Sequence, residues 1–272
     1  MMKNIIKNYI PSNLKYYLTY LKKWNHNLYS IKKAIDLNDN FSDFFVWNKE
    51  CGQIEFVAEN IRSIISGENI EITHNFRFFS EDGKFIENQK FKTKDFFKKL
   101  TLKKISTKSK YISFTHHVES EYSLKKLLIE KGIKNTKNIS EQNRGYTIYY
   151  PGKQNSGSAV HGNFGGISKN DFKRAKTYYR KHIYTPIYQF EQGSIYDLVF
   201  NNPTNKEIVI NLIFNNKGTN KCIKIPSLGT RYYKTFNYKG SISFESNLPI
   251  CRALLFKNPA PNSNGTFDVF HT

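Results

Sequence analysis

Two stretches decide the fold class of this chain: ITHNFRF at residues 72–78 and IVINLIF at residues 208–214. In both, apolar side chains alternate with mostly polar ones. Because successive side chains of a β-strand point to opposite faces, this period of two predicts strands with one buried face. Similar short runs recur along the chain at a spacing of roughly 8–12 residues, with turn residues between them, which is typical of a β-sandwich or barrel. The pair Asp82-Gly83, after the first stretch, predicts a hairpin turn.

The patterns of the first half return in the same order in the second half. Four pairs of segments align with small gaps: 52–57 with 193–198, 72–78 with 208–214, 111–114 with 241–244, and 155–161 with 263–271. Repeated self-similarity in one order indicates an internal duplication. The alternative is two unrelated strand-rich halves. We therefore expect a mainly β protein of two tandem antiparallel β-sandwich domains, immunoglobulin-like in architecture although the Cys-Trp-Cys pattern of that fold is missing.

The same patterns predict the domain boundaries. Residues 46–166 form the first sandwich, with a helical insertion near 119–143, and residues 184–272 form the second. Residues 167–183 form a basic linker. Residues 1–45 form a basic amphipathic helical segment, because residues 1–35 contain seven lysines and no acid, and apolar residues from Leu14 to Leu21 recur at helical spacing. This helix suits an anionic membrane surface, with Lys15, Lys22, Lys23 and Trp24 as contacts, or else docks on the following domain.

Charge is the strongest feature of the composition. The chain of 272 residues has 42 Lys+Arg against 22 Asp+Glu, a net charge of +20. Such a field concentrates polyanions, whereas the excess of lysine over arginine argues against sequence-specific reading of nucleic acid. The expected anion-binding residues come from the lysine-rich stretch 84–110 and from the linker: Lys98, Lys99, Lys103, Lys104, Lys173, Arg174, Arg180 and Lys181.

Histidines provide the candidate for chemistry. Strand alternation places His74 and His116 on apolar faces, and His161 ends a predicted strand, so the three imidazoles could bind zinc or copper with one position left open. Glu119 would then serve as the base. The alternative is that each histidine is hydrogen-bonded separately within the core. His117 belongs to the opposite face, which is either a polar groove or a solvated sheet surface.

These observations favour a non-catalytic binding or accessory protein for an anionic partner, either an acidic glycan or an anionic membrane surface, for instance in the assembly of cell-surface polysaccharide. The alternatives are a metal-dependent enzyme, a structural or assembly protein that oligomerises, and a non-specific nucleic-acid binder. With 39% hydrophobic residues the chain is not of the disordered class, and its three cysteines do not suffice for a disulfide scaffold. Because no signal peptide and no apolar run of about 18 residues is present, we expect a cytoplasmic protein, with a peripheral position at the inner membrane face as the alternative.

Overall fold

The computed structural model describes part of the chain, and every structural statement below refers to that part. It comprises residues 44–136, 145–152, 156–162, 182–184, 190, 193–202, 207–214, 219–246, 253–259 and 267–271. The predicted N-terminal helix and most of the predicted linker lie outside these residues.

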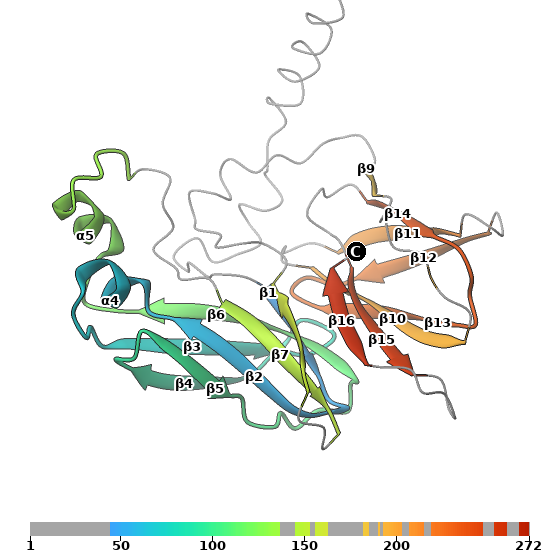
Figure 1. Ribbon diagram of the computed structural model, residues 1–272. Coiled ribbons are helices and arrows are strands. Elements are labelled where there is room, and N and C mark those ends of the chain that lie inside the picture. The colour runs from blue at the N-terminus through green and yellow to red at the C-terminus, as the bar shows by residue number, and fades with distance from the viewer. Residues whose placement is uncertain are drawn as a thin grey trace, which may run out of the picture.

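The first half of the structure, strands β1 to β8, combines eight strands with two short helices (Figure 1). The strands are β1 (Phe44–Asn48), β2 (Cys51–Glu59), β3 (Ile72–Phe79), β4 (Phe85–Thr93), β5 (Phe97–Thr101), β6 (Tyr111–Glu119), β7 (Gly145–Pro151) and β8 (Ser158–His161). The helices are α4 (Ile61–Ser66) and α5 (Leu124–Glu130). Helix α5 lies within the predicted insertion, and the side chain of Ser123 caps its first turn by accepting a hydrogen bond from the Lys126 amide.

The second half contains eight further strands. They are β9 (His182–Tyr184), β10 (Ser194–Asn201), β11 (Ile208–Phe214), β12 (Thr219–Ile225), β13 (Thr230–Phe236), β14 (Ile242–Ser246), β15 (Leu254–Pro259) and β16 (Asp268–His271). Residues 72–78 and 208–214, which the alternation predicts as strands, lie in β3 and β11. The pair Asp82-Gly83 lies in the turn that joins β3 to β4.

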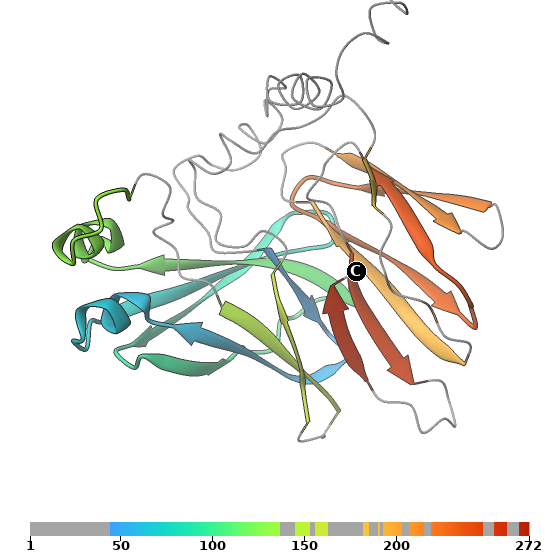
Figure 2. The same cartoon turned by 45° about the horizontal axis from the view of Figure 1, so that its top comes forward.

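The strands form four antiparallel sheets of four strands each. Sheet 1 has the order β1-β6-β3-β4 and sheet 2 the order β5-β2-β7-β8; sheet 3 has the order β13-β10-β15-β16 and sheet 4 the order β12-β11-β14-β9. The mainly β, antiparallel class predicted from the sequence is therefore confirmed. The four sheets are best described as a four-bladed, propeller-like ring, so the prediction of two separate sandwiches is confirmed only in its β class (Figure 2).

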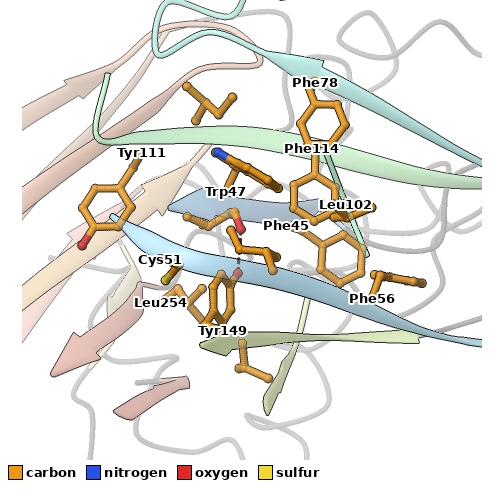
Figure 3. Close-up of a cluster of buried hydrophobic side chains, with 14 of the residues drawn as sticks. Phe45, Trp47, Cys51, Phe56, Phe78, Leu102, Tyr111, Phe114, Tyr149 and Leu254 are labelled. Atoms are coloured by element: carbon orange, nitrogen blue, oxygen red, sulfur yellow. Dashed lines mark hydrogen bonds between the residues drawn. The ribbon is translucent and has the colours of Figure 1, made fainter. Parts of the chain in front are cut away.

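Sheet 3 shows why the halves are not separate, because it is buried on both faces. Tyr196, Leu198 and Phe200 pack with sheet 4 in one core cluster. Val199 and Phe256 pack instead with residues of sheets 1 and 2 in the other core cluster. Figure 3 shows the second cluster, with Leu254 of the second half among first-half side chains. The main hydrophobic core of the first half is thus completed by residues of the second half.

Candidate anion-binding site

Of the sequence-predicted lysines, Lys98 and Lys99 lie on the edge strand β5, and Lys103 and Lys104 lie in the segment that follows it. Strand β4 ends sheet 1 and strand β5 ends sheet 2, and a short turn joins them (Figure 1). Nine lysines on these strands and their flanking turns are exposed, and we call them the basic edge: Lys84, Lys90, Lys92, Lys94, Lys98, Lys99, Lys103, Lys104 and Lys108. Lysines at a sheet edge also discourage edge-to-edge pairing with another chain.

Acidic residues neutralise only part of the basic edge. Lys98 donates to Asp95 at 2.8 Å, and the hydrogen bond and charge of Lys98 lower the pKa of Asp95. Lys90 and Lys92 lie 3.4 and 3.5 Å from Glu119 and Glu71. No ion pair within the described part of the chain involves the other six lysines. Exposed pairs of this kind contribute about 0–1 kcal/mol and leave most of the positive field intact.

Other predicted binding residues cannot be placed. The described residues do not include the predicted anion contacts of the linker, Lys173, Arg174, Arg180 and Lys181. They also do not include the predicted membrane contacts Lys15, Lys22, Lys23 and Trp24.

Two of the three predicted metal ligands meet in the core of the first half. His74 and His116 are fully buried on neighbouring strands β3 and β6, and Nδ1 of His74 lies 2.9 Å from Nε2 of His116. The His116 ring also packs against Phe56 and Phe76, with centroids 4.5 and 4.9 Å apart. A hydrogen bond explains the nitrogen–nitrogen distance, whereas two nitrogens at about 2.0–2.1 Å from one tetrahedral zinc would lie about 3.4 Å apart.

His161 does not join this pair. Its ring lies against Tyr146, with centroids 5.9 Å apart, and its Nδ1 is 3.4 Å from the carbonyl oxygen of Gly145. No group of three or more His, Cys, Asp or Glu side chains in the described residues is arranged to hold a metal ion. The sequence-based prediction of a site formed by His74, His116 and His161 is therefore corrected to a buried pair with a separate third histidine.

Burial keeps the histidine pair neutral. It lowers the pKa of His74 to about 4, and burial together with the charges of His74 and His117 lowers the pKa of His116 well below its usual value. Nε2 of His74 has no hydrogen-bond partner among the residues that the structure describes. A buried polar atom without a partner costs about 1–3 kcal/mol, which makes the pair a point of low stability in an aromatic core.

Glu119, the predicted base, lies at the end of β6 and faces solvent. It accepts a hydrogen bond from Nδ2 of Asn75 at 2.8 Å, and this bond, assisted by Lys90, lowers the pKa of Glu119. The carboxylate is thus held in its ionised form by an amide and an ammonium group. A general base with a pKa near neutrality would need the opposite environment.

The face of sheet 1 that points away from the main core of the first half is polar, although Asn75, Thr115 and His117 on it are buried. We call it the polar face: Thr73, Asn75 and Arg77 on β3, Thr115, His117 and Glu119 on β6, and Asn88, Lys90 and Lys92 on β4. Asn75 stands directly opposite both His117 and Lys90 in the ladders. The alternation in residues 72–78 could have identified this face, because it separates Thr73, Asn75 and Arg77 from the apolar positions.

A buried polar network joins the two halves. Asp197 of β10 is fully buried, and its Oδ2 accepts hydrogen bonds from the hydroxyl of Tyr111 at 2.6 Å and from Nζ of Lys110 at 2.9 Å. Burial acts to lower the pKa of Lys110, but its hydrogen bonds to Glu50 and Asp197 raise the pKa overall. This network is structural, since every partner in it is a side chain of the chain itself.

Comparisons with known proteins give no family. The sequence matches no protein-family model, and no curated protein matches it. Of the helices in the described residues, none is long and apolar enough to cross a membrane.

Proposed function

We propose that the chain is a non-catalytic binding protein for an anionic partner, and that the basic edge is its main contact surface. The observation that supports this proposal is the concentration of nine exposed lysines on two edge strands, β4 and β5, and the segments that flank them. Charges are screened over about 8 Å at physiological salt, so a cluster on two strands joined by one short turn acts together, whereas scattered lysines do not. An acidic glycan and an anionic lipid surface both offer such charge without demanding the arginine geometry of base recognition.

The fold we propose beneath this surface is a pair of tandem β-sandwiches that arose by duplication. Adding eight to each strand number converts the order β1-β6-β3-β4 into β9-β14-β11-β12, which is sheet 4, and the order β5-β2-β7-β8 into sheet 3. Within each half the chain crosses repeatedly from one sheet to the other, a connectivity that the paired sheets of a sandwich also show. The four segment pairs aligned in the sequence all fall on strands related by this shift.

A location at the cytoplasmic face of a membrane, beside the assembly of an acidic polysaccharide, is the context that we propose for such a protein. The basic segment 1–35 would add a second contact with anionic lipid. Deleting residues 1–35 should then weaken binding to vesicles that contain phosphatidylglycerol while leaving glycan binding at the basic edge intact.

The proposal is tested by measuring binding to polygalacturonate and to phosphatidylglycerol vesicles over a range of salt concentrations. Replacing Lys98, Lys99, Lys103 and Lys104 by serine should weaken binding at least tenfold and flatten its salt dependence, because fewer counterions are displaced. The matched control also removes four charges: it replaces Lys221, Lys224, Lys234 and Lys239 by serine, on the equivalent strands β12 and β13 of the second half and in the segment after β13. Equal losses in the two variants would show a response to net charge alone and would contradict a role for the basic edge.

A further inference from the structure

Exposed large apolar side chains gather at one end of the first half. Six of the ten such side chains in the described residues lie there: Ile64, Phe96, Phe97, Tyr122, Ile129 and Ile133. A single exposed apolar side chain is normal on a protein surface. A group of six, contributed by three separate segments of the chain, instead indicates a surface that meets a partner.

The strand ladders bring the three segments to the same end. Glu59 at the end of β2 pairs with Phe97 at the start of β5, so α4, which follows β2, lies beside the β4–β5 turn. In sheet 1, Thr73 at the start of β3 pairs with Lys92 near the end of β4 and with Glu119 at the end of β6. The segment that leads from β6 to α5 therefore starts at this end as well.

Hydrogen bonds connect the three segments directly. The Asn60 amide donates to the carbonyl oxygen of Phe96 at 2.8 Å, which joins the start of α4 to the β4–β5 turn. Nε of Arg62 donates to the carbonyl oxygen of Tyr122 at 2.6 Å, which joins α4 to the segment before α5. The two helices lie side by side and project beyond the sheets (Figures 1 and 2). We call this part of the molecule the helical end: residues 60–70, 94–99 and 120–134.

Lysines alternate with the apolar side chains of the helical end. The two phenylalanines stand within the sequence KDFFKK at 94–99, and the two isoleucines of the α5 segment within KLLIEKGIK at 126–134. All six lysines of these two stretches are exposed, and the three of the first stretch also belong to the basic edge. The helical end as a whole has eight lysine and arginine residues against four acids, a net charge of +4.

This mixture of side chains fits a lipid surface better than a protein partner. The centre of a protein–protein interface is depleted of lysine. In a membrane-surface segment, by contrast, apolar side chains enter the boundary between headgroups and acyl chains, and lysines beside them contact the lipid phosphates. Lysine stems can lie along apolar surface while their ammonium groups stay in water. The positive charge favours anionic lipid.

We propose that the helical end docks on an anionic lipid bilayer, with Phe97 and Ile129 entering the boundary between headgroups and acyl chains. These two side chains are 63% and 55% exposed. This inference rests on the proposed function and names the anionic lipid surface as the partner. The basic edge would attract the bilayer from a distance, and the apolar side chains beside it would then insert. Neither charge nor a small apolar surface alone gives stable membrane binding.

The first test removes apolar contact without changing the charge. Phe97→Ser combined with Ile129→Ser should weaken binding of the full chain to phosphatidylglycerol vesicles by about fivefold or more in a co-sedimentation assay. Binding to polygalacturonate, which offers charge but no acyl chains, should be unchanged. The matched control is Phe236→Ser combined with Val209→Ser, two exposed apolar positions of the second half, which should alter neither binding. Both double variants should keep the wild-type unfolding temperature, because all four side chains are exposed.

A second measurement reports insertion directly. In Ile129→Trp, the additional indole emission should shift to shorter wavelength when phosphatidylglycerol vesicles are added. Lipids brominated in their acyl chains should quench this emission, because the indole lies within reach of the bromine atoms. In Phe236→Trp, the corresponding emission should neither shift nor be quenched. Subtracting the wild-type emission removes the contribution of the two native tryptophans.

The outcomes separate this inference from the proposed function. If Phe97→Ser with Ile129→Ser binds vesicles as the wild type does and Ile129→Trp is not quenched, the helical end is refuted. The basic edge then still stands, provided that its four-lysine substitution weakens polygalacturonate binding. Equally tight binding to pure phosphatidylcholine vesicles would refute anionic lipid as the partner.

Two further outcomes would also refute the lipid contact. An oligomer that the same two substitutions disperse, with no quenching of Ile129→Trp by brominated lipid, would show that a second copy of the chain covers the helical end. A wild type that binds neither phosphatidylglycerol vesicles nor polygalacturonate would refute the helical end and the proposed function together.

Discussion

The two halves of the molecule share a strand order but differ in the chemistry of equivalent faces. On the polar face of sheet 1, Asn75 is flanked by His117 and Lys90, whereas on sheet 4 Asn211 is flanked by Glu245 and Cys222. One row further along, the first half has Arg77 and the second half has Ile213 at the central strand. The common strand order therefore places Arg77 and Lys90 on this face of the first half where the second half has Ile213 and Cys222, so the equivalent faces differ in charge.

The inward faces differ in the same way. Where the first half has His74 and His116 in its core, the positions that the ladders place as equivalent in the second half are Ile210 and Phe244, both buried. The second core is therefore purely apolar at the point where the first contains two neutral imidazoles. We therefore expect the histidine pair to lower the stability of the first half relative to an apolar core. The following variants measure which contacts contribute most to the free energy of unfolding.

The largest effect should come from the network that joins the halves. Replacing Asp197 by alanine removes the buried partner of Tyr111 and Lys110, and breaking a buried ion pair in this way should lower the free energy of unfolding by about 3–5 kcal/mol. The control is Asp268→Ala, since this exposed carboxylate also accepts a hydrogen bond from the other half, through Oγ of Ser158. Urea denaturation measures the free energy of unfolding of the two variants. Similar decreases would contradict the expectation that the buried carboxylate of Asp197 contributes more to stability than the exposed carboxylate of Asp268.

A smaller effect is expected from the turn that touches the second half. Gly83 and Gly67 both have a positive φ, 79° and 80°, so alanine is strained at either position by about 1 kcal/mol. A Cβ at Gly83 would lie 1.7 Å from the carbonyl oxygen of Ser227, whereas a Cβ at Gly67 meets nothing within 4 Å.

Gly83→Ala should therefore cost about 2–3 kcal/mol more than Gly67→Ala, because contacts between the halves must shift as well. Thermal unfolding of the two variants checks this difference. Equal unfolding temperatures would mean that the β3–β4 turn moves away from Ser227 without loss, and that the two halves are coupled less closely than their contacts indicate.

The histidine pair should make the first half sensitive to acid. The pKa of His74 falls from its ordinary 6.5 to about 4 on folding, so the unfolded chain binds more protons between these values. The contribution of neutral His74 is complete above pH 6.5 and is lost as the pH falls toward 4. We expect a loss of about 2 kcal/mol between pH 7 and pH 5 from this group alone.

The double substitution His74→Ile with His116→Phe copies the second half and should remove this part of the pH dependence. Chemical denaturation of both proteins at pH 7 and pH 5 provides the measurement. A wild-type protein that is as stable at pH 5 as at pH 7 would show that the pair is protonated within the fold, against the direction derived from its burial.

Sequence reasoning found strands by their alternation or by short apolar runs and missed several strands at the sheet edges. The alternation in residues 72–78 and 208–214 led directly to β3 and β11. Strands β4, β5 and β13 were not predicted, because at a sheet edge lysines and exposed aromatic residues such as Phe97 and Phe236 replace the regular apolar face. Helix α4 was also missed, since its six residues are too few for a helical period to be visible.

The alignment of the two halves fell on strands that the shift of eight relates, but its register differs in β10 and, by two residues, in β14, where it paired Phe114 instead of His116 with Phe244. Sequence similarity paired Ile54 with Ile195, but the inward side chain corresponding to Ile54 is Tyr196, because the inward positions of β10 are Tyr196, Leu198 and Phe200. Sheet 3 is buried on both faces, which removes the alternation that sets the register in a half-exposed strand. The same burial explains why the charged Asp197 was not recognised as an interior residue.

The sequence also predicted only part of the candidate sites. Strand alternation correctly placed His74 and His116 in the interior, but it carries no information on distances between sheets, so it could not exclude His161 from the pair. Identifying the polar face requires the order of the strands in sheet 1, and this order comes from the strand pairing in the structure.

The doubly buried sheet 3 also has a consequence for biosynthesis. The core of the first half includes Leu254, Phe256 and Val269, which leave the ribosome long after β8 ends at His161. At about 5–20 residues per second, the residues between them take about 5–20 s to synthesise. During that interval the nascent first half presents Tyr111 and Tyr149 without the side chains that cover them, which makes it a client for chaperones until the final strands arrive.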